Sequence, residues 1–175
     1  MSRSFRAAAP LLALMLVPAF ARAQGSGPTY NFAAGWALPT GSFGDFNDSG
    51  FGLTAGITFP APGSPIRLRA EAAYNQFNHS QPLDQSSRAG GFTGNAVYDF
   101  SMGPGAQFTP YAIGGVGFYG TRFSDNGATD WNFGWNLGGG VRFPLSGFSV
   151  YVEARYHSIS SVDVSFAPIV FGVSF

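Results

Sequence analysis

Large apolar residues recur at every second position through most of the chain after residue 28. In residues 51–59, for example, the apolar side chains alternate with glycines and threonines. A period of two places successive side chains on opposite faces of a β-strand, whereas a helix needs a period of 3.6. Comparable segments are residues 30–38, 66–75, 92–100, 132–143, 148–157 and 169–175. In residues 108–119 both parities carry apolar residues and glycines, so the inward or outward assignment of this fifth strand stays open. The pattern predicts eight strands.

The two faces of these strands differ in chemistry. One face carries the charged residues of the strands among small polar ones: Arg67, Arg69, Glu71, Asp99, Arg142, Glu153 and Arg155. The other face has aromatic residues towards the strand ends and small or aliphatic residues between them, which matches the two membrane interfaces of a spanning barrel. A soluble lipocalin-like barrel also alternates, but it would have to pack all of these aromatic rings into a narrow interior. The apolar face is therefore expected to face lipid.

The connectors between the strands alternate in character. Residues 60–65, 101–106 and 144–147 are short and rich in proline and glycine, whereas residues 39–50, 78–89 and 121–131 are longer and polar, with 158–161 as a short fourth member. Short turns at one end and longer loops at the other are typical of outer-membrane barrels. Lipid hydrocarbon offers no hydrogen-bond partner to backbone N–H and C=O groups. A membrane-spanning sheet can therefore have no open edge and must close into a barrel. The sequence predicts an all-β protein, an eight-stranded antiparallel up-and-down transmembrane β-barrel.

An eight-stranded barrel has an interior just wide enough for side chains to fill. The four arginines and three acids of the inner face would be unfavourable there unless they pair with one another. We expect a structural ionic network in which Glu71 and Glu153 pair with Arg69, Arg67 or Arg155. An alternative rests on small inner residues, which would thin one side of the lumen and leave a narrow pore: Gly52, Gly56, Gly134, Gly138, Gly140 and Gly172.

Composition and the first residues of the chain indicate the cellular compartment and argue against some classes of function. Only 10% of residues are charged, against about 25% in soluble domains, 17% are aromatic, and there is no cysteine for a disulfide scaffold or thiolate metal site. Residues 1–23 combine Arg3 and Arg6 with an apolar run and a small-residue cleavage site, which predicts a signal peptide before a barrel domain at 24–175. The remaining 6 arginines against 9 acids give a charge of −3, which argues against a nucleic-acid binder.

Three short motifs could carry chemistry, and none is complete. His157 with Ser158, Ser160 and Glu153 could form a catalytic triad, but strand parity sends Ser158 to the opposite face from His157. His79, which precedes Ser80, is no stronger a candidate for a catalytic triad. The segment Asp45-x-Asn47-x-Ser49-Gly50 resembles the start of a calcium loop, yet Gly56 stands where a bidentate glutamate belongs. Gly115-x-Gly117-x-x-Gly120 has no following helix to bind a phosphate. We therefore predict no catalytic residues, metal or cofactor.

Several segments together resemble the small eight-stranded outer-membrane barrels of the OmpA/OmpX-like and opacity-like groups. They are Pro39-Thr40-Gly41-Ser42-Phe43-Gly44-Asp45, residues 110–117, 136–143 and 152–157, and the terminal Phe171-Gly172-Val173-Ser174-Phe175. The resemblance implies the outer membrane of a Gram-negative-type bacterium, with lipid and lipopolysaccharide as surroundings. It also implies that the barrel-assembly machinery reads the last strand, with Phe175 as the signal.

The resemblance leaves three functions in order of preference. The first is a non-enzymatic barrel with a structural, adhesive or interaction role, in which surface loops present a site for an extracellular ligand. The second is a narrow pore or small-solute channel. The third is a lipid A-modifying enzyme, on a loose likeness to barrel lipid A deacylases that use a His-x-Ser pair and an acid. It is disfavoured because the residue two positions after His157 is Ile159.

Overall fold

The computed structural model describes residues 27–79, 86–123, 128–160 and 162–175. The predicted signal peptide lies outside the described residues. The chain forms eight strands and one short 3-10 helix, η1: β1 (Thr29–Thr40), η1 (Gly41–Asp45), β2 (Asn47–Pro60), β3 (Ile66–His79), β4 (Ser86–Asp99), β5 (Thr109–Arg122), β6 (Asp130–Pro144), β7 (Ser149–Ile159) and β8 (Val164–Ser174). In the described part of the chain, no helix is long and apolar enough to cross a membrane.

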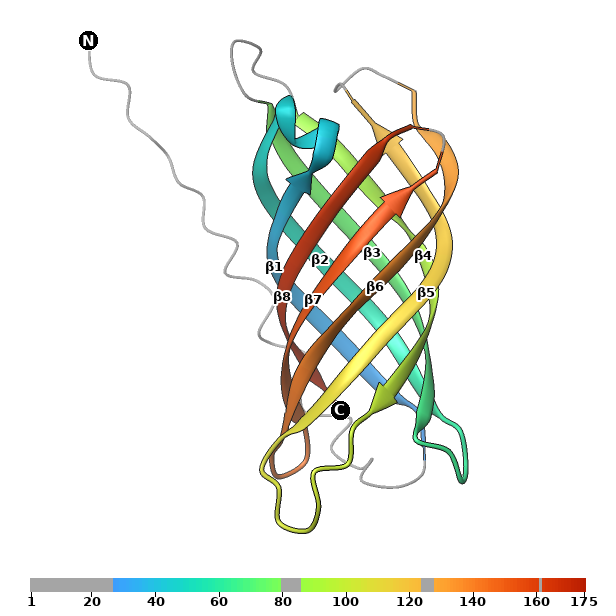
Figure 1. The fold of residues 1–175 in the computed structure, drawn as a ribbon, viewed down its shortest axis with the longest axis vertical. Coiled ribbons are helices and arrows are strands. Elements are labelled where there is room, and N and C mark those ends of the chain that lie inside the picture. Colours follow the sequence, from blue (N-terminus) through green and yellow to red (C-terminus); the bar gives the residue numbers. More distant parts are fainter. Residues whose placement is uncertain (1–26, 80–85, 124–127, 161) are drawn as a thin grey trace, which may run out of the picture.

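Each strand pairs antiparallel with the next, and β1 also pairs with β8, so the sheet closes into a barrel. The closing seam runs from Asn31 opposite Ser174 to Thr40 opposite Ser165. Figure 1 shows the strands winding obliquely around one axis, with η1 at the upper end. The start of β1 and the C-terminus lie at the lower end. The predicted eight-stranded antiparallel up-and-down barrel is confirmed.

The burial of side chains alternates along the strands as predicted. Outward aromatic residues are open to the surroundings, with Trp36 60% and Phe92 66% exposed, whereas inward residues such as Glu71 and Arg155 are buried. The fifth strand, which the sequence left open, has Tyr111, Ile113 and Tyr119 inside and Val116 and Phe118 outside. Its pattern was ambiguous because both of its faces are apolar: one meets lipid, and the other fills the lumen.

The connectors differ from the sequence prediction in length. The expected loop at 39–50 is reduced to residues 41–46, because β1 continues to Thr40 and β2 starts at Asn47. At the lower end, residues 100–108 between β4 and β5 form a longer connector than this one. The predicted contrast between short turns and long loops was wrong. The backbones of polar residues at the strand ends still form hydrogen bonds with the neighbouring strand. A polar composition therefore does not mark where a strand ends.

Candidate functional site

Four charged side chains from β3 and β7 meet at the middle of the lumen. Arg69 Nη1 donates to Glu153 Oε2 at 2.8 Å, and Arg155 Nη2 donates to Glu71 Oε1 at 2.5 Å. Two further ion pairs complete the set, Arg155 Nε to Glu153 Oε1 at 2.9 Å and Arg69 Nη1 to Glu71 Oε2 at 3.7 Å. All four side chains are at most 2% exposed. These four residues are called the ionic ring below.

The alternation of the strands brings the ionic ring together. Arg69 and Glu71 are two positions apart on β3, as are Glu153 and Arg155 on β7, so both side chains of each pair point inward. The strands lie on opposite sides of the closed sheet, and the long side chains bridge the lumen between them. Two positive and two negative groups balance, which compensates the desolvation of charge. Removing one member of such a set typically destabilises a protein by about 3–5 kcal/mol.

Two tyrosines from β5 and β7 pack against the ionic ring. The Tyr111 hydroxyl donates to Glu153 Oε2 at 2.8 Å. The guanidinium carbon of Arg69 lies 5.9 Å from the ring centroid of Tyr111 and 5.7 Å from that of Tyr151. Both distances are within the range of a cation–π contact. The charged layer is therefore enclosed by aromatic carbon as well as by its own partners.

The tyrosine rings occupy the space beside inner glycines. A Cβ added to Gly140 would come within 2.5 Å of the Tyr111 ring, and one added to Gly172 would collide with the Tyr151 ring. Higher in the barrel, a Cβ on Gly134 would lie 2.9 Å from the ring of Tyr119. Small residues thus let large neighbours lie flat across the lumen. The space that the glycines provide is filled, which argues against an open path along this side.

The remaining three predicted ionic residues form a second group nearer the lower end. Asp99 pairs with Arg67 (Nε to Oδ2, 2.6 Å) and with Arg142 (Nη2 to Oδ1, 3.2 Å). These side chains are 16–25% exposed, so they meet solvent where the ionic ring does not. Arg67 was one of three expected partners for Glu71 and Glu153, but its ion pair is with Asp99. Arg67 is two residues away from Arg69 on β3, which places it roughly 7 Å lower in the barrel, below the ionic ring.

The upper end of the lumen is closed by aromatic residues. Phe43 of η1, Phe77 of β3 and Phe166 of β8 are 7%, 0% and 0% exposed. The Phe43 and Phe77 ring centroids are 5.1 Å apart, and those of Phe77 and Phe166 are 5.5 Å apart. These three phenylalanines are called the aromatic plug below. Ala37, Ala89, Tyr119, Ile159 and Val164 complete the same buried cluster.

His157 lies directly beneath the aromatic plug and faces into the lumen. Its ring stacks on Phe166 with centroids 4.9 Å apart, and its Nδ1 is 3.0 Å from the hydroxyl of Tyr119. The sequence analysis missed this layer. Phe77 could have been found, since it is in phase with inward Glu71 on the same strand. Phe43 could not, because it lies in a connector where strand alternation gives no information.

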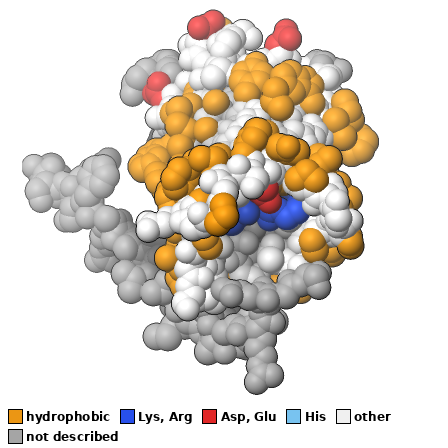
Figure 2. Space-filling view, turned by 60° about the horizontal axis from the view of Figure 1, so that its bottom comes forward, with side chains coloured by type: hydrophobic (Ala, Val, Ile, Leu, Met, Phe, Trp, Pro, Cys, Tyr) orange, Lys and Arg blue, Asp and Glu red, His pale blue; other side chains and the backbone are white. Residues whose placement is uncertain are grey.

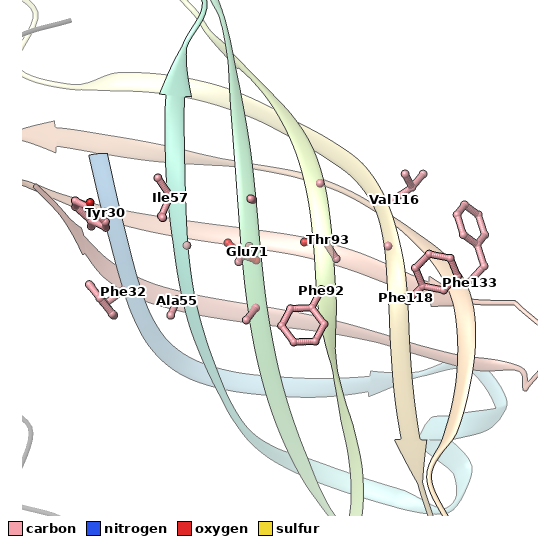
Figure 3. Close-up of a pocket in the computed structure, with 15 residues that line it drawn as sticks. Tyr30, Phe32, Ala55, Ile57, Glu71, Phe92, Thr93, Val116, Phe118 and Phe133 are labelled. Carbon is pink, nitrogen blue, oxygen red and sulfur yellow. The ribbon is translucent and has the colours of Figure 1, made fainter. Parts of the chain in front are cut away.

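The outer wall carries a hollow of about 760 Å³ that extends over the successive strands from β1 to β6. In Figure 3 the rings of Phe118 and Phe133 lie on one side of it, Tyr30 and Phe32 lie on the other, and Phe92 lies between them. Its floor is made by small outward residues: Ala55, Ala70, Ala72 and Gly94. The hollow is part of the apolar belt, where lipid chains can fill such a recess.

Comparison with known proteins identifies the fold family. A family model described as the outer membrane protein beta-barrel domain matches residues 7–175. The chain belongs to this family. It is an integral β-barrel protein of the Gram-negative type of outer membrane. No curated protein sequence matches it significantly.

Solved barrels of low sequence identity share the fold. Neisserial surface protein A is 16% identical, with 85% of this chain and 96% of that chain covered and a TM-score of 0.69. OprG of Pseudomonas aeruginosa is 16% identical over 86% and 97% of the two chains, with a TM-score of 0.58. The outer membrane enzyme PagL is 21% identical over 83% and 97%, with a TM-score of 0.52. The fold alone therefore does not decide whether a barrel is an enzyme, since PagL is one.

The structure does not assemble the triad considered from the sequence. His157 is 2% exposed inside the lumen, where its ring is hydrogen-bonded to the Tyr119 hydroxyl, while Ser158 is on the outward face of β7. Ser160 follows the end of β7 and is exposed. Glu153 is held in the ionic ring by both arginines. The side chain of His79 lies outside what the structure describes.

The other two motifs are parts of strands or their ends. Asn47 is buried at the start of β2, and its amide donates to the Phe43 carbonyl at 3.0 Å. Within the described segments, no three His, Cys, Asp or Glu residues are placed to hold a metal ion. Gly115 and Gly117 lie within β5, where an added Cβ would collide with the β4 backbone at Gly94 and Phe92, respectively. Close strand packing therefore accounts for these glycines.

Proposed function

We propose that this protein is an occluded outer-membrane barrel that acts through its extracellular end, in an adhesive or other interaction role, and conducts no solute. The observation that carries the proposal is the filling of the lumen at three successive levels. The group around Asp99 occupies the lower end, the ionic ring with its tyrosines occupies the middle, and the aromatic plug occupies the upper end.

A pore would need a hydrated path past all three levels. An eight-stranded barrel has room for little more than its own side chains. Here Phe77 and Phe166 are completely buried within the plug, and the ring side chains are at most 2% exposed. Opening a path would separate paired charges and expose aromatic surface at the same time. The filled lumen therefore favours a surface role over the narrow-pore alternative.

The upper end offers the features expected of an interacting surface. It carries η1 and the connectors β1–β2, β3–β4, β5–β6 and β7–β8, and we assign it to the cell exterior (Figure 1). Phe46 is 69% exposed beside η1, and Trp131 is 58% exposed near the start of β6. Asp45 and Asp48 are exposed next to Phe46. Apolar rings beside carboxylates can bind a protein or glycan ligand.

The other proposed partners follow from the same placement. Outer-membrane lipid and lipopolysaccharide would surround the aromatic belt. The barrel-assembly machinery would recognise the last strand together with Phe175, which directly follows it and pairs its backbone with Tyr30. An extracellular ligand would bind at the loops. We propose no enzymatic activity, because His157 and Ser158 point to opposite faces of β7.

The proposal is tested by replacing segments 80–85 and 124–127 with Gly-Ser sequences of equal length. Cells expressing each form would be applied to an array of immobilised glycans and matrix proteins. Heat-dependent gel mobility would establish that both forms fold. We expect wild-type cells to be retained on specific spots and the replaced form to lose most of that retention. Equal retention of the two forms and of cells with an empty vector would contradict a role for these loops.

A further inference from the structure

The lower end of the barrel contains a polar pocket beside the group around Asp99. It has a volume of about 360 Å³. Arg67 and Arg142 line it together with three hydroxyl residues, Thr29, Ser149 and Ser174. Figure 2 shows this end of the molecule: blue arginine side chains lie beside a red carboxylate in a recess with an orange rim. A cationic recess opens towards water on this side.

The charge in this pocket is not balanced by side chains. Arg67 and Arg142 share one carboxylate, Asp99, at 2.6 Å and 3.2 Å. Each guanidinium has five N–H donors, and the recorded contacts to Asp99 use only two from Arg67 and one from Arg142. The ionic ring above is internally neutral, so it supplies no second carboxylate. Among the described side chains, the two arginines therefore have one carboxylate partner and keep N–H donors for a further acceptor.

Other features of the pocket favour a small oxyanion over water alone. Thr29 Oγ1 is buried without a hydrogen-bond partner among the described residues, and Thr29 lines the same pocket. The Arg142 guanidinium carbon lies 5.1 Å from the ring centroid of Tyr111, which helps to fix its orientation. Guanidinium forks match phosphate oxygens in geometry as well as in charge. Leu145, Phe148 and Phe175 add an apolar wall to the pocket.

We propose that this lower pocket, built around Arg67 and Arg142, binds a phosphate group, either free inorganic phosphate or the headgroup phosphate of a phospholipid. Arg142 and Arg67 would donate to the phosphate oxygens through the N–H groups that Asp99 leaves unoccupied. The hydroxyls of Thr29 and Ser174 would complete the oxygen-binding surface, and the apolar wall would contact the acyl or glycerol part of a lipid.

The test uses the full barrel folded in a phosphate-free glycoside detergent and titrated with inorganic phosphate, followed by arginine side-chain NMR. We expect saturable shifts of Arg67 and Arg142. Arg142→Gln should weaken binding by about tenfold or more, since a charged hydrogen-bond donor is lost. Asp99→Asn should tighten binding, because it removes the competing carboxylate. The control Arg122→Gln, at the upper end of β5 and away from the pocket, should leave the titration unchanged.

A second arm separates the two sources of phosphate. The barrel in nanodiscs of phosphatidylglycerol would be released into the gas phase and its retained lipids counted by native mass spectrometry. One lipid retained by wild type and lost in Arg142→Gln supports a headgroup ligand, whereas binding seen only with inorganic phosphate supports the free ion. The absence of any saturable shift in wild type and in Asp99→Asn would mean that the two arginines bind no phosphate even when their carboxylate partner is removed. That result would overturn the proposal.

Discussion

Replacing Glu153 by leucine removes one of the two negative charges of the ionic ring and leaves two arginines against Glu71 alone. Arg69 and Arg155 both lose an ion pair, at 2.8 Å and 2.9 Å, and both remain 2% exposed. The Tyr111 hydroxyl loses its acceptor at the same time. From the effect of leaving a buried charge unpaired, we expect the free energy of unfolding to fall by about 3–5 kcal/mol.

The double variant Arg69→Met with Glu153→Leu separates the charge effect from the loss of packing. It leaves one arginine and one glutamate, Arg155 and Glu71, which are paired at 2.5 Å. Because apolar residues of similar size can replace a buried ion pair with little loss, most of the stability should return. Refolded barrels in lipid vesicles would be unfolded with urea and followed by tryptophan fluorescence, with heat-dependent gel mobility as the check on folding.

A surface carboxylate provides the matched control. Asp45 is exposed in η1, and Asp45→Leu should change the free energy of unfolding by less than about 1 kcal/mol. The reasoning is refuted if Glu153→Leu changes stability no more than this control. It is also refuted if the double variant is less stable than Glu153→Leu by the full effect of Arg69→Met, because the two residues would then act independently.

Three further perturbations test separate parts of the account. Gly140→Ala should lower the urea midpoint by an amount equivalent to about 1–3 kcal/mol, because its Cβ collides with the Tyr111 ring, whereas Gly94→Ala, with no atom within 4 Å, should have almost no effect. Phe77→Ala should destabilise the barrel by about 3–5 kcal/mol in the same assay, since it empties the centre of the aromatic plug. Replacing Ser158 and Ser160 by alanine should leave lipid A acylation in expressing cells identical to that of wild type, measured by mass spectrometry; a difference between the two would revive the enzymatic alternative.

The alternation of the strands was sufficient to predict the barrel and its inside. Closure forces every second residue inward, so Arg69, Glu71, Glu153 and Arg155 could be placed in one lumen without knowing the register. Their partners could not be derived, because register between strands decides which charges share a level. That is why Arg67 was one of three candidate partners for Glu71 and Glu153, whereas it in fact contacts Asp99.

Strand ends and connectors were less predictable. A polar segment at a barrel end can pair its backbone as strand or turn back, and its composition is similar in both cases. The aromatic plug depends on such a segment: Phe43 reaches the lumen only because η1 folds over the end of the barrel. Tyr111 and Tyr119 were hidden for another reason, since β5 is apolar on both faces and its period-two signal cancels.

The occlusion of the lumen is tested most directly by recording planar-bilayer current from the refolded wild-type barrel, with folding established by heat-dependent gel mobility. Three filled levels predict a folded protein that gives no steady current steps. Reproducible steps whose size changes when Glu71 or Arg155 is neutralised would contradict the account, because they would mean that ions pass along the ionic ring.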